Sequence, residues 1–138
     1  MSLVSLDHCS IRTAKLHETC EFFVDIIGLE VGFRPEFPFP GEFLYLGDQA
    51  VIHLVGIDKE DTSGLINTLG GETDPEKLDG SGAIDHIAFR ANNIEQMLKK
   101  LDENDFSYFQ RKVTGMDLFQ IFLKDPNGIT IELNYWKK

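Results

Sequence analysis

The strongest constraint on the fold of this chain is an internal repeat. The six residues DHCSIR at positions 7–12 return as DHIAFR at positions 85–90, with three of six residues identical and an offset of 78. Self-similarity at a fixed offset indicates a duplicated structural unit. We therefore expect a single domain over residues 1–138, built from a module of about 1–57, a linker of about 58–82 and a second module of about 83–138.

Each module has the pattern of a strand, a helix and three further strands. Alternating or apolar runs predict strands over 4–12, 29–33, 43–46 and 50–55, and over 84–90, 107–113, 118–123 and 129–135. Helical spacing is shown by Leu16, Cys20, Phe23 and Ile27 in the first module, and by Ile94, Met97, Leu98 and Leu101 in the second. The first helix is expected to end at Gly28, and the second to begin at Asn92 or Asn93. The chain is therefore expected to be α+β.

Turn-forming residues lie between the last two strands of each module and in the linker. Residues 47–49 and 125–128 are rich in Gly, Asp, Asn and Pro, so each joins the last two strands of its module into a hairpin. The linker is rich in Gly, Ser, Thr and acidic residues, and only 65–69 suggests a short helix.

The strand pattern places four potential metal ligands on one kind of surface. Because side chains alternate across a strand, His8 and His86 face away from the apolar side, which belongs under the helix. His53 and Glu132 likewise face away from the apolar side of the last strand in each module. His8 and His53 are 45 residues apart, and His86 and Glu132 are 46 apart, as two copies of one scaffold require. If the two curved sheets meet about a pseudo-twofold axis, these four side chains converge on one concave surface.

These residue types are suited to one divalent metal ion. Neutral imidazole and carboxylate bind iron, manganese, nickel, cobalt or zinc, and two histidines with one carboxylate are a known arrangement for catalytic iron. A histidine on a strand is more often a hydrogen-bonded structural residue, but chance does not readily put His or Glu at four equivalent positions. We therefore expect His8, His86 and Glu132 to bind the metal. His53 is either a fourth ligand, a base or a substrate contact.

Other residues are candidates for substrate binding. Arg12 and Arg90 share the open face, where they either hold an anionic part of a substrate or form surface ion pairs. Residues 33–41, FRPEFPFPG, predict a stiff loop instead of a central strand. Its Phe37 and Phe39 either form an apolar wall for the substrate or pack on the protein or a partner subunit. Alternation also places on this face Tyr45, Phe122, Gln120 and Asn134.

Composition disfavours several classes of protein. Thirteen basic and twenty-three acidic side chains give a net charge of −10, which opposes binding to nucleic acid or anionic membranes. No segment approaches the roughly 20 apolar residues of a membrane span, and the first residues lack the pattern of a secretory signal. We therefore expect a cytoplasmic protein whose two cysteines, Cys9 and Cys20, are reduced and buried.

Three segments carry a resemblance to a known family. LDH at 6–8, IDHIAF at 84–89 and DPNGITIEL at 125–133 are similar to motifs of the vicinal oxygen chelate superfamily, which includes glyoxalases, bleomycin-resistance proteins and extradiol dioxygenases. The resemblance implies two paired βαβββ modules that form a cupped, mostly antiparallel sheet, with helices on the outer face. It also implies one metal held by the first and last strands of each module, where His8, His53, His86 and Glu132 fall.

The resemblance leaves three functions open. We expect a glyoxalase-like isomerase or lyase that chelates neighbouring oxygens of a small metabolite through an enediolate-like intermediate, with Glu132 or His53 as the base. Glyoxalases usually carry Glu where this chain has His53, whereas dioxygenases resemble this chain in using His, His and Glu at the other three positions. An Fe(II) extradiol dioxygenase is therefore the second possibility. The third is a metal-free protein that binds a drug or another small molecule, and for all three we expect a homodimer.

Overall fold

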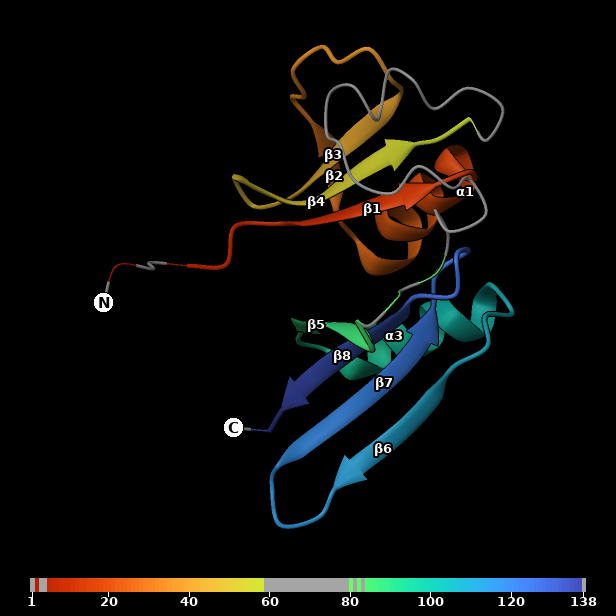
Figure 1. The fold of residues 1–138 in the computed structure, drawn as a ribbon. Helices are drawn as coiled ribbons and strands as arrows, with labels where there is room; N and C mark the ends of the chain where they lie inside the picture. Colours follow the sequence, from red (N-terminus) through yellow and green to blue (C-terminus); the bar gives the residue numbers. More distant parts are fainter. Residues whose placement is uncertain (1, 3–4, 59–79, 81, 83, 138) are drawn as a thin grey trace. The chain divides into compact units, whose positions relative to one another are not determined.

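The computed structural model describes residues 2, 5–58, 80, 82 and 84–137. It divides into two compact units, Met1–Asp79 and Gly80–Lys138, and each unit has a sheet of its own (Figure 1). Nearly all of the predicted linker lies outside the described residues, and so does its short helix at 65–69. The assignment of both modules to a single domain stays a prediction.

Over residues 5–58, the described part of the first unit contains one helical segment and four strands. In chain order its elements are β1 (Cys9–Thr13), α1 (Leu16–Glu21), the π-helical η1 (Phe22–Ile27), β2 (Glu30–Gly32), β3 (Gly41–Leu46) and β4 (Gln49–Gly56). The strands are ordered β1-β4-β3-β2, and the pairing of β1 with β4 is parallel while the other two pairings are antiparallel.

The second unit repeats this plan. Its elements are β5 (His86–Arg90), α3 (Ile94–Glu103), β6 (Phe109–Val113), β7 (Leu118–Lys124) and β8 (Thr130–Trp136). The order β5-β8-β7-β6, with β5 parallel to β8, is the order of the first sheet (Figure 1). The predicted α+β class with two βαβββ modules is therefore confirmed.

The strands begin later than the sequence predicted at both repeated motifs. The strand expected over 4–12 begins at Cys9, so His8 immediately precedes β1, and the strand expected over 84–90 begins at His86. The proline-rich segment 33–40 contains no strand, as predicted, because proline cannot donate a ladder hydrogen bond.

The first helix differs from the predicted apolar stripe. The N–H of Gly28 donates to the carbonyl of Phe23 over 3.0 Å, a span of five residues that is typical of a π-helix. A π-turn holds an extra residue, so the buried face shifts relative to ordinary helical spacing. Phe23 of the predicted stripe is fully buried, while Leu16, Cys20 and Ile27 are half-buried. Thr19, Phe22 and Ile26, which lie outside that stripe, are buried as well. Gly28 ends the segment with a φ of +99°, as expected of a helix C-cap.

The second helix follows its predicted pattern. Asn93 is the N-cap, and its side-chain oxygen accepts a hydrogen bond from the Gln96 N–H over 3.3 Å. Leu101 is fully buried, while Met97 and Leu98 are half-buried. The apolar stripe therefore points to the protein interior, as expected.

The core of each unit lies on one face of its sheet. Ile52 and Leu54 of β4 are buried, and so are Ile131 and Leu133 of β8. His53 and Glu132 alternate with these residues and are half-buried, so they belong to the opposite face. In the described residues, no helix is both long and apolar enough to cross a membrane.

Candidate metal and substrate site

The strand register puts His53 and Glu132 at equivalent places in the two units. Ser10, two residues after His8, pairs with His53, and Ala88, two residues after His86, pairs with Glu132. The strand on the other side supplies a phenylalanine in each case, Phe43 opposite His53 and Phe122 opposite Glu132. The duplicated scaffold therefore presents two like-placed polar side chains, each between the first strand and a phenylalanine.

In the first unit the two candidate ligands, His8 and His53, are in direct contact. The rings of His8 and His53 are stacked with their centroids 3.7 Å apart and their planes 13° apart. Phe43 stacks on the other face of His53, at 3.6 Å and 11°. His53 is thus sandwiched between an imidazole and a phenyl ring, which holds its ring plane in one orientation.

The protonation pattern of His8 follows from its neighbour. Its Nδ1 lies 2.6 Å from Oδ2 of Asp7, and an ionised carboxylate can only accept, so Nδ1 carries the hydrogen. The neutral ring then has its lone pair on Nε2. The Gln49 side-chain amide donates to the Asp7 carbonyl, which ties the segment before β1 to the start of β4.

His86 in the second unit is oriented in the same way. Its Nδ1 donates to Oδ2 of Asp85 over 2.8 Å, so the lone pair of the neutral ring lies on Nε2. Nε2 lies 3.7 Å from Oε1 of Glu132, whose side chain is only 12% exposed. Two donor atoms each about 2.1 Å from one metal are roughly 3.0 to 3.4 Å apart, so a small movement would let both groups bind one ion.

Glu132 is held by a row of polar side chains. Its Oε2 accepts a hydrogen bond from Nδ2 of Asn134 over 2.9 Å. Oδ1 of Asn134 accepts from Nε2 of Gln120 over 2.9 Å. Oε1 of Gln120 in turn accepts from Nε and Nη2 of Arg111, at 3.0 and 2.6 Å. Alternation in the sequence placed Gln120 and Asn134 on this face. It did not single out Arg111, because the strand around it has polar residues on both faces and therefore shows no apolar side.

The surroundings shift the pKa of two of the histidines in opposite directions. Burial, together with the nearby His8, lowers the pKa of His53 below its ordinary value of 6.5. The hydrogen bond to Asp85, together with the charge of Glu132, raises the pKa of His86 above 6.5. At neutral pH His53 is therefore a neutral ring able to accept a proton.

The predicted loop extends the aromatic contacts of the first unit. Phe37 is stacked with Phe39 at 5.3 Å and lies 6.4 Å from Phe43, which contacts His53. The Arg34 guanidinium lies over both loop rings, and its Nη2 donates to the Phe39 carbonyl over 3.0 Å. The loop therefore leads from its own rings to the histidine pair. The sequence pattern did not identify Arg34 and Phe43 as site residues, because their roles depend on contacts that only the folded chain makes.

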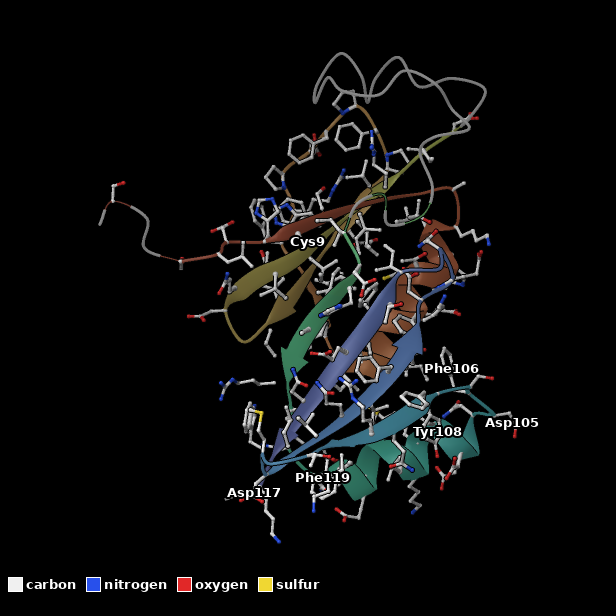
Figure 2. The ribbon with its side chains drawn as sticks, turned by 60° about the horizontal axis from the view of Figure 1, so that its bottom comes forward. Cys9, Asp105, Phe106, Tyr108, Asp117 and Phe119 are labelled. Atoms are coloured by element: carbon white, nitrogen blue, oxygen red, sulfur yellow. The ribbon has the colours of Figure 1, made fainter. Side chains whose placement is uncertain are left out.

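The other predicted substrate residues have different surroundings. Tyr45 donates its hydroxyl to the Phe33 carbonyl over 2.7 Å, so it braces the start of the loop. The Arg90 guanidinium lies over Trp136, 5.6 Å from the ring centroid, whereas Arg12 is half-buried on β1. Phe122 borders a hollow of about 400 Å³ at the β6 edge, which is also lined by Phe106 (labelled in Figure 2).

The structure brings the four ligand candidates together two by two, one pair in each unit. Among the described residues, no group of three or more His, Cys, Asp or Glu side chains is close enough to hold a metal ion. The carboxylates that orient the histidines, Asp7 and Asp85, were not singled out from the sequence. Their signal was present, because Asp precedes His in both copies of the repeat.

Both thiols are free, and both are half-buried instead of fully buried. Burial raises the pKa of Cys9 and of Cys20, so neither has the thiolate character of a reactive cysteine.

Comparison with known proteins assigns the family. Residues 5–133 match the model of the glyoxalase/bleomycin resistance protein/dioxygenase superfamily, and the chain belongs to this superfamily. Over 140 aligned residues it is 29% identical to Glyoxylase I 4 of Arabidopsis thaliana, covering 96% of this chain and 71% of that protein.

Two solved structures illustrate the range of the fold. A Bacillus anthracis protein assigned to the glyoxalase family superposes with a TM-score of 0.73 at 18% identity, covering 99% of this chain and 98% of the other. TnmS3, an antibiotic binding protein from Streptomyces sp. CB03234, superposes with a TM-score of 0.68 at 17% identity, covering 99% of each chain. At these identities the likeness concerns the fold alone, which enzymes and binding proteins share.

Proposed function

We propose that this protein is a metal-dependent enzyme of the glyoxalase type, an isomerase or lyase acting on a small metabolite with two neighbouring oxygens. One divalent ion, iron, manganese, nickel, cobalt or zinc, is held by His8, His86 and Glu132, with His53 as the fourth ligand or as the base. The observation that carries the proposal is the duplicated Asp–His pair, which fixes the same tautomer in both units.

The residues present fit a divalent ion. A metal-binding histidine usually donates its second ring N–H to a carboxylate or carbonyl, as His8 and His86 both do. Glu132 has one oxygen bonded by Asn134 and the other toward His86 Nε2, so one oxygen remains for a ligand role. When bound, the metal would act as a Lewis acid that polarises the substrate oxygens.

Two side chains of the chain are suited to move a proton. His53 is neutral at pH 7 because burial and His8 disfavour its charged form, and its ring is held between His8 and Phe43. It can therefore accept a proton from carbon next to a carbonyl and return it. Glu132 is the other candidate, and in that case His53 completes the ligand set.

A specific observation favours a second candidate, an extradiol dioxygenase that uses Fe(II). The chain has histidine at position 53, where glyoxalases usually have glutamate, and the remaining set of His8, His86 and Glu132 resembles that of the dioxygenases. In this case His53 stays off the metal and acts as an acid or base. The third candidate, a metal-free binding protein, stays open because the matched superfamily includes bleomycin resistance proteins.

The acidic balance of −10 fits a small-molecule substrate better than nucleic acid or a membrane surface, and we place the protein in the cytoplasm as a homodimer. Light scattering coupled to size exclusion measures the assembly directly.

The deciding experiment is elemental analysis of the purified wild-type protein beside alanine variants of three histidines. His8→Ala is expected to lose the metal, whereas His17→Ala, which removes an exposed histidine paired with Glu21, is expected to retain it. The His53→Ala result separates the two roles, since loss of metal makes His53 a ligand and retention makes it a base. Retention of metal by His8→Ala would contradict the proposed site.

Activity assays separate the three functions. The isomerase or lyase predicts turnover of a 2-oxo substrate without oxygen. The dioxygenase predicts oxygen uptake with catechols after anaerobic Fe(II) loading. If wild-type protein contains no metal and has no affinity for Mn(II), Fe(II), Ni(II) or Zn(II), both metal-dependent enzymes are excluded, and a metal-free binding protein is the remaining candidate.

A further inference from the structure

We propose that Arg111 is a positioning residue that acts through Gln120 and Asn134 to hold the Glu132 carboxylate in a one-oxygen binding mode. The inference rests on the proposed function, because it takes Glu132 to be a metal ligand. Arg111 itself would not touch the metal or the substrate. The four side chains, Arg111, Gln120, Asn134 and Glu132, are called here the polar row.

The strand register makes the polar row a continuous feature of one sheet face. Arg111 of β6 pairs with Gln120 of β7, and Gln120 pairs with Asn134 of β8, so the three occupy neighbouring positions across three strands. Glu132 lies two residues before Asn134 on β8 and therefore on the same face. In this register the neighbouring side chains lie within hydrogen-bond distance of one another.

The direction of every hydrogen bond in the polar row is fixed at both ends, because Arg111 can only donate and an ionised Glu132 can only accept. A guanidinium has only donors, so the Gln120 atom that it contacts must be the carbonyl oxygen. The Gln120 amide nitrogen then faces Asn134 and donates to its oxygen. The Asn134 nitrogen is left to donate to Oε2 of Glu132. Without Arg111 the Gln120 carbonyl loses two donors, so the Gln120 amide is held less firmly in the place from which it donates to Asn134, and the support of the carboxylate is weakened.

Packing keeps Arg111 in this place. Its guanidinium lies over the Phe122 ring, 5.3 Å from the centroid, and Phe122 is the cross-strand neighbour of Glu132. Gln120 is only 6% exposed, so water does not readily replace a lost partner of its amide. The polar row therefore begins on the exposed edge strand and ends at the half-buried carboxylate.

A charge effect and a positioning effect of Arg111 differ in sign. If Arg111 acted only by its positive charge, removing it would strengthen the attraction of the site for a cation. If it positions Glu132, removing it weakens metal binding. Direct hydrogen-bond partners of a ligand typically contribute 10-fold to 100-fold in affinity, and Arg111, two amides further out, is expected at the lower end of this range. The chain offers a matched control in Lys112, the next residue of β6, which faces the other side and lies over Phe119 (labelled in Figure 2).

The first test is a Co(II) titration of the full chain, followed by visible absorption, for wild type, Arg111→Met and Lys112→Met. Both variants lose one positive charge, so their long-range electrostatics are alike. We expect Arg111→Met to bind Co(II) about 10-fold more weakly and with an altered spectrum, and Lys112→Met to match the wild type. Equal affinities and spectra for the two variants would overturn the inference.

A second variant tests whether the residues act in series. Gln120→Met breaks the polar row at its centre, so adding Arg111→Met to it should cause little further loss of affinity. Losses that multiply in the double variant would mean that Arg111 acts independently of Gln120, and the inference would fail.

A metal-free measurement keeps the inference separate from the proposed function. In amide ¹H–¹⁵N spectra recorded without metal, Arg111→Met should shift the side-chain NH₂ signals of Gln120 and Asn134, and Lys112→Met should not. Unmoved signals in Arg111→Met would overturn the polar row. If wild-type protein binds no Co(II) while Arg111→Met still shows these shifts, the polar row stands. That result would instead overturn Glu132 as a metal ligand, and with it the proposed function.

Discussion

At the scale of single residues, the histidines differ chiefly in what holds them. His86 and His8 each donate Nδ1–H to the preceding aspartate, whereas His53 is fixed by ring stacking. A carboxylate partner makes an imidazole a better ligand, and the hydrogen bond to Asp85 raises the pKa of His86, whereas burial and the nearby His8 lower the pKa of His53. The two kinds of support suit two different roles, a ligand and a base.

The aspartates can be tested by removing only their charge. Asp85→Asn should lower the pKa of His86, because the hydrogen bond to Asp85 is the largest cause of its rise, and should weaken metal binding about 10-fold. NMR titration of the imidazole and a metal titration measure the two effects. Asp105→Asn, on an exposed residue with a φ of +51° that asparagine tolerates, is the control. An unchanged His86 pKa in Asp85→Asn would refute the pairing.

The pH dependence of the metal-free protein follows from the same shifts. His53 should titrate below 6.5 and His86 above 6.5 in imidazole NMR signals. A lowered folded pKa means that the unfolded chain binds more protons, so the His53 contribution to stability is present above 6.5 and is lost as pH falls through the folded value. The His86 contribution has the opposite sign, being present below 6.5 and lost as pH rises through its folded value. Reversed titration order would contradict the described environments.

At the scale of elements, Arg34 holds the two aromatic rings of the proline-rich loop. Arg34 contacts both Phe37 and Phe39 and donates to a loop carbonyl. Proline restricts each loop residue locally, but these contacts decide where the rings lie. The loop therefore depends on Arg34 to keep its aromatic side chains next to Phe43.

Replacing Arg34 should release the loop without unfolding the sheet. Arg34→Ala is expected to lower the free energy of unfolding by about 1 to 2 kcal/mol, because two cation–π contacts and one hydrogen bond are lost. Urea denaturation measures the change, and hydrogen exchange at the loop amides reports its release. Glu36→Ala, an exposed position in the same loop, should be within about 0.5 kcal/mol of wild type. Equal stability of both variants would show that Arg34 does not hold the loop.

At the scale of the whole molecule, the proposed site needs both modules. Each unit supplies only two of the four candidates, so one metal per chain is expected and not one per module. A ligand that binds only the folded protein stabilises it, by about 2.7 kcal/mol at a free concentration 100 times its Kd. Saturating metal should therefore raise the Tm of wild type, and the increase should be lost in both His8→Ala and His86→Ala.

The metal content per chain, and refolding of two mixed variants, test whether the two modules share one site. Elemental analysis that gave two metals per chain, or a Tm increase kept by His86→Ala, would contradict a shared site. Mixing unfolded His8→Ala and His86→Ala chains and refolding them together restores metal binding only if the ligands come from two different chains. Recovery would assign the site to paired modules of a dimer, and no recovery would assign it to one chain.

The sequence by itself determined the plan of the fold, because that plan is written in local patterns. The 78-residue repeat, the helical and strand periods and the turn residues together predicted two βαβββ modules, and the structure confirms them. Like-facing positions of His53 and Glu132 also followed from alternation along single strands. The strand starts did not, because local patterns do not show where cross-strand pairing begins. The full buried face of the first helix did not either, because apolar spacing does not show a π-turn.

Tertiary structure alone decided how the polar side chains are connected. The contact between Arg111 and Asn134 through Gln120 joins three strands across 23 residues of sequence, and it depends on the cross-strand register. Likewise His53 meets Phe43 and His8 only because β4 lies between β3 and the start of β1. Periodicity reports which face a side chain occupies, whereas its partners on that face are set by strands distant in the chain.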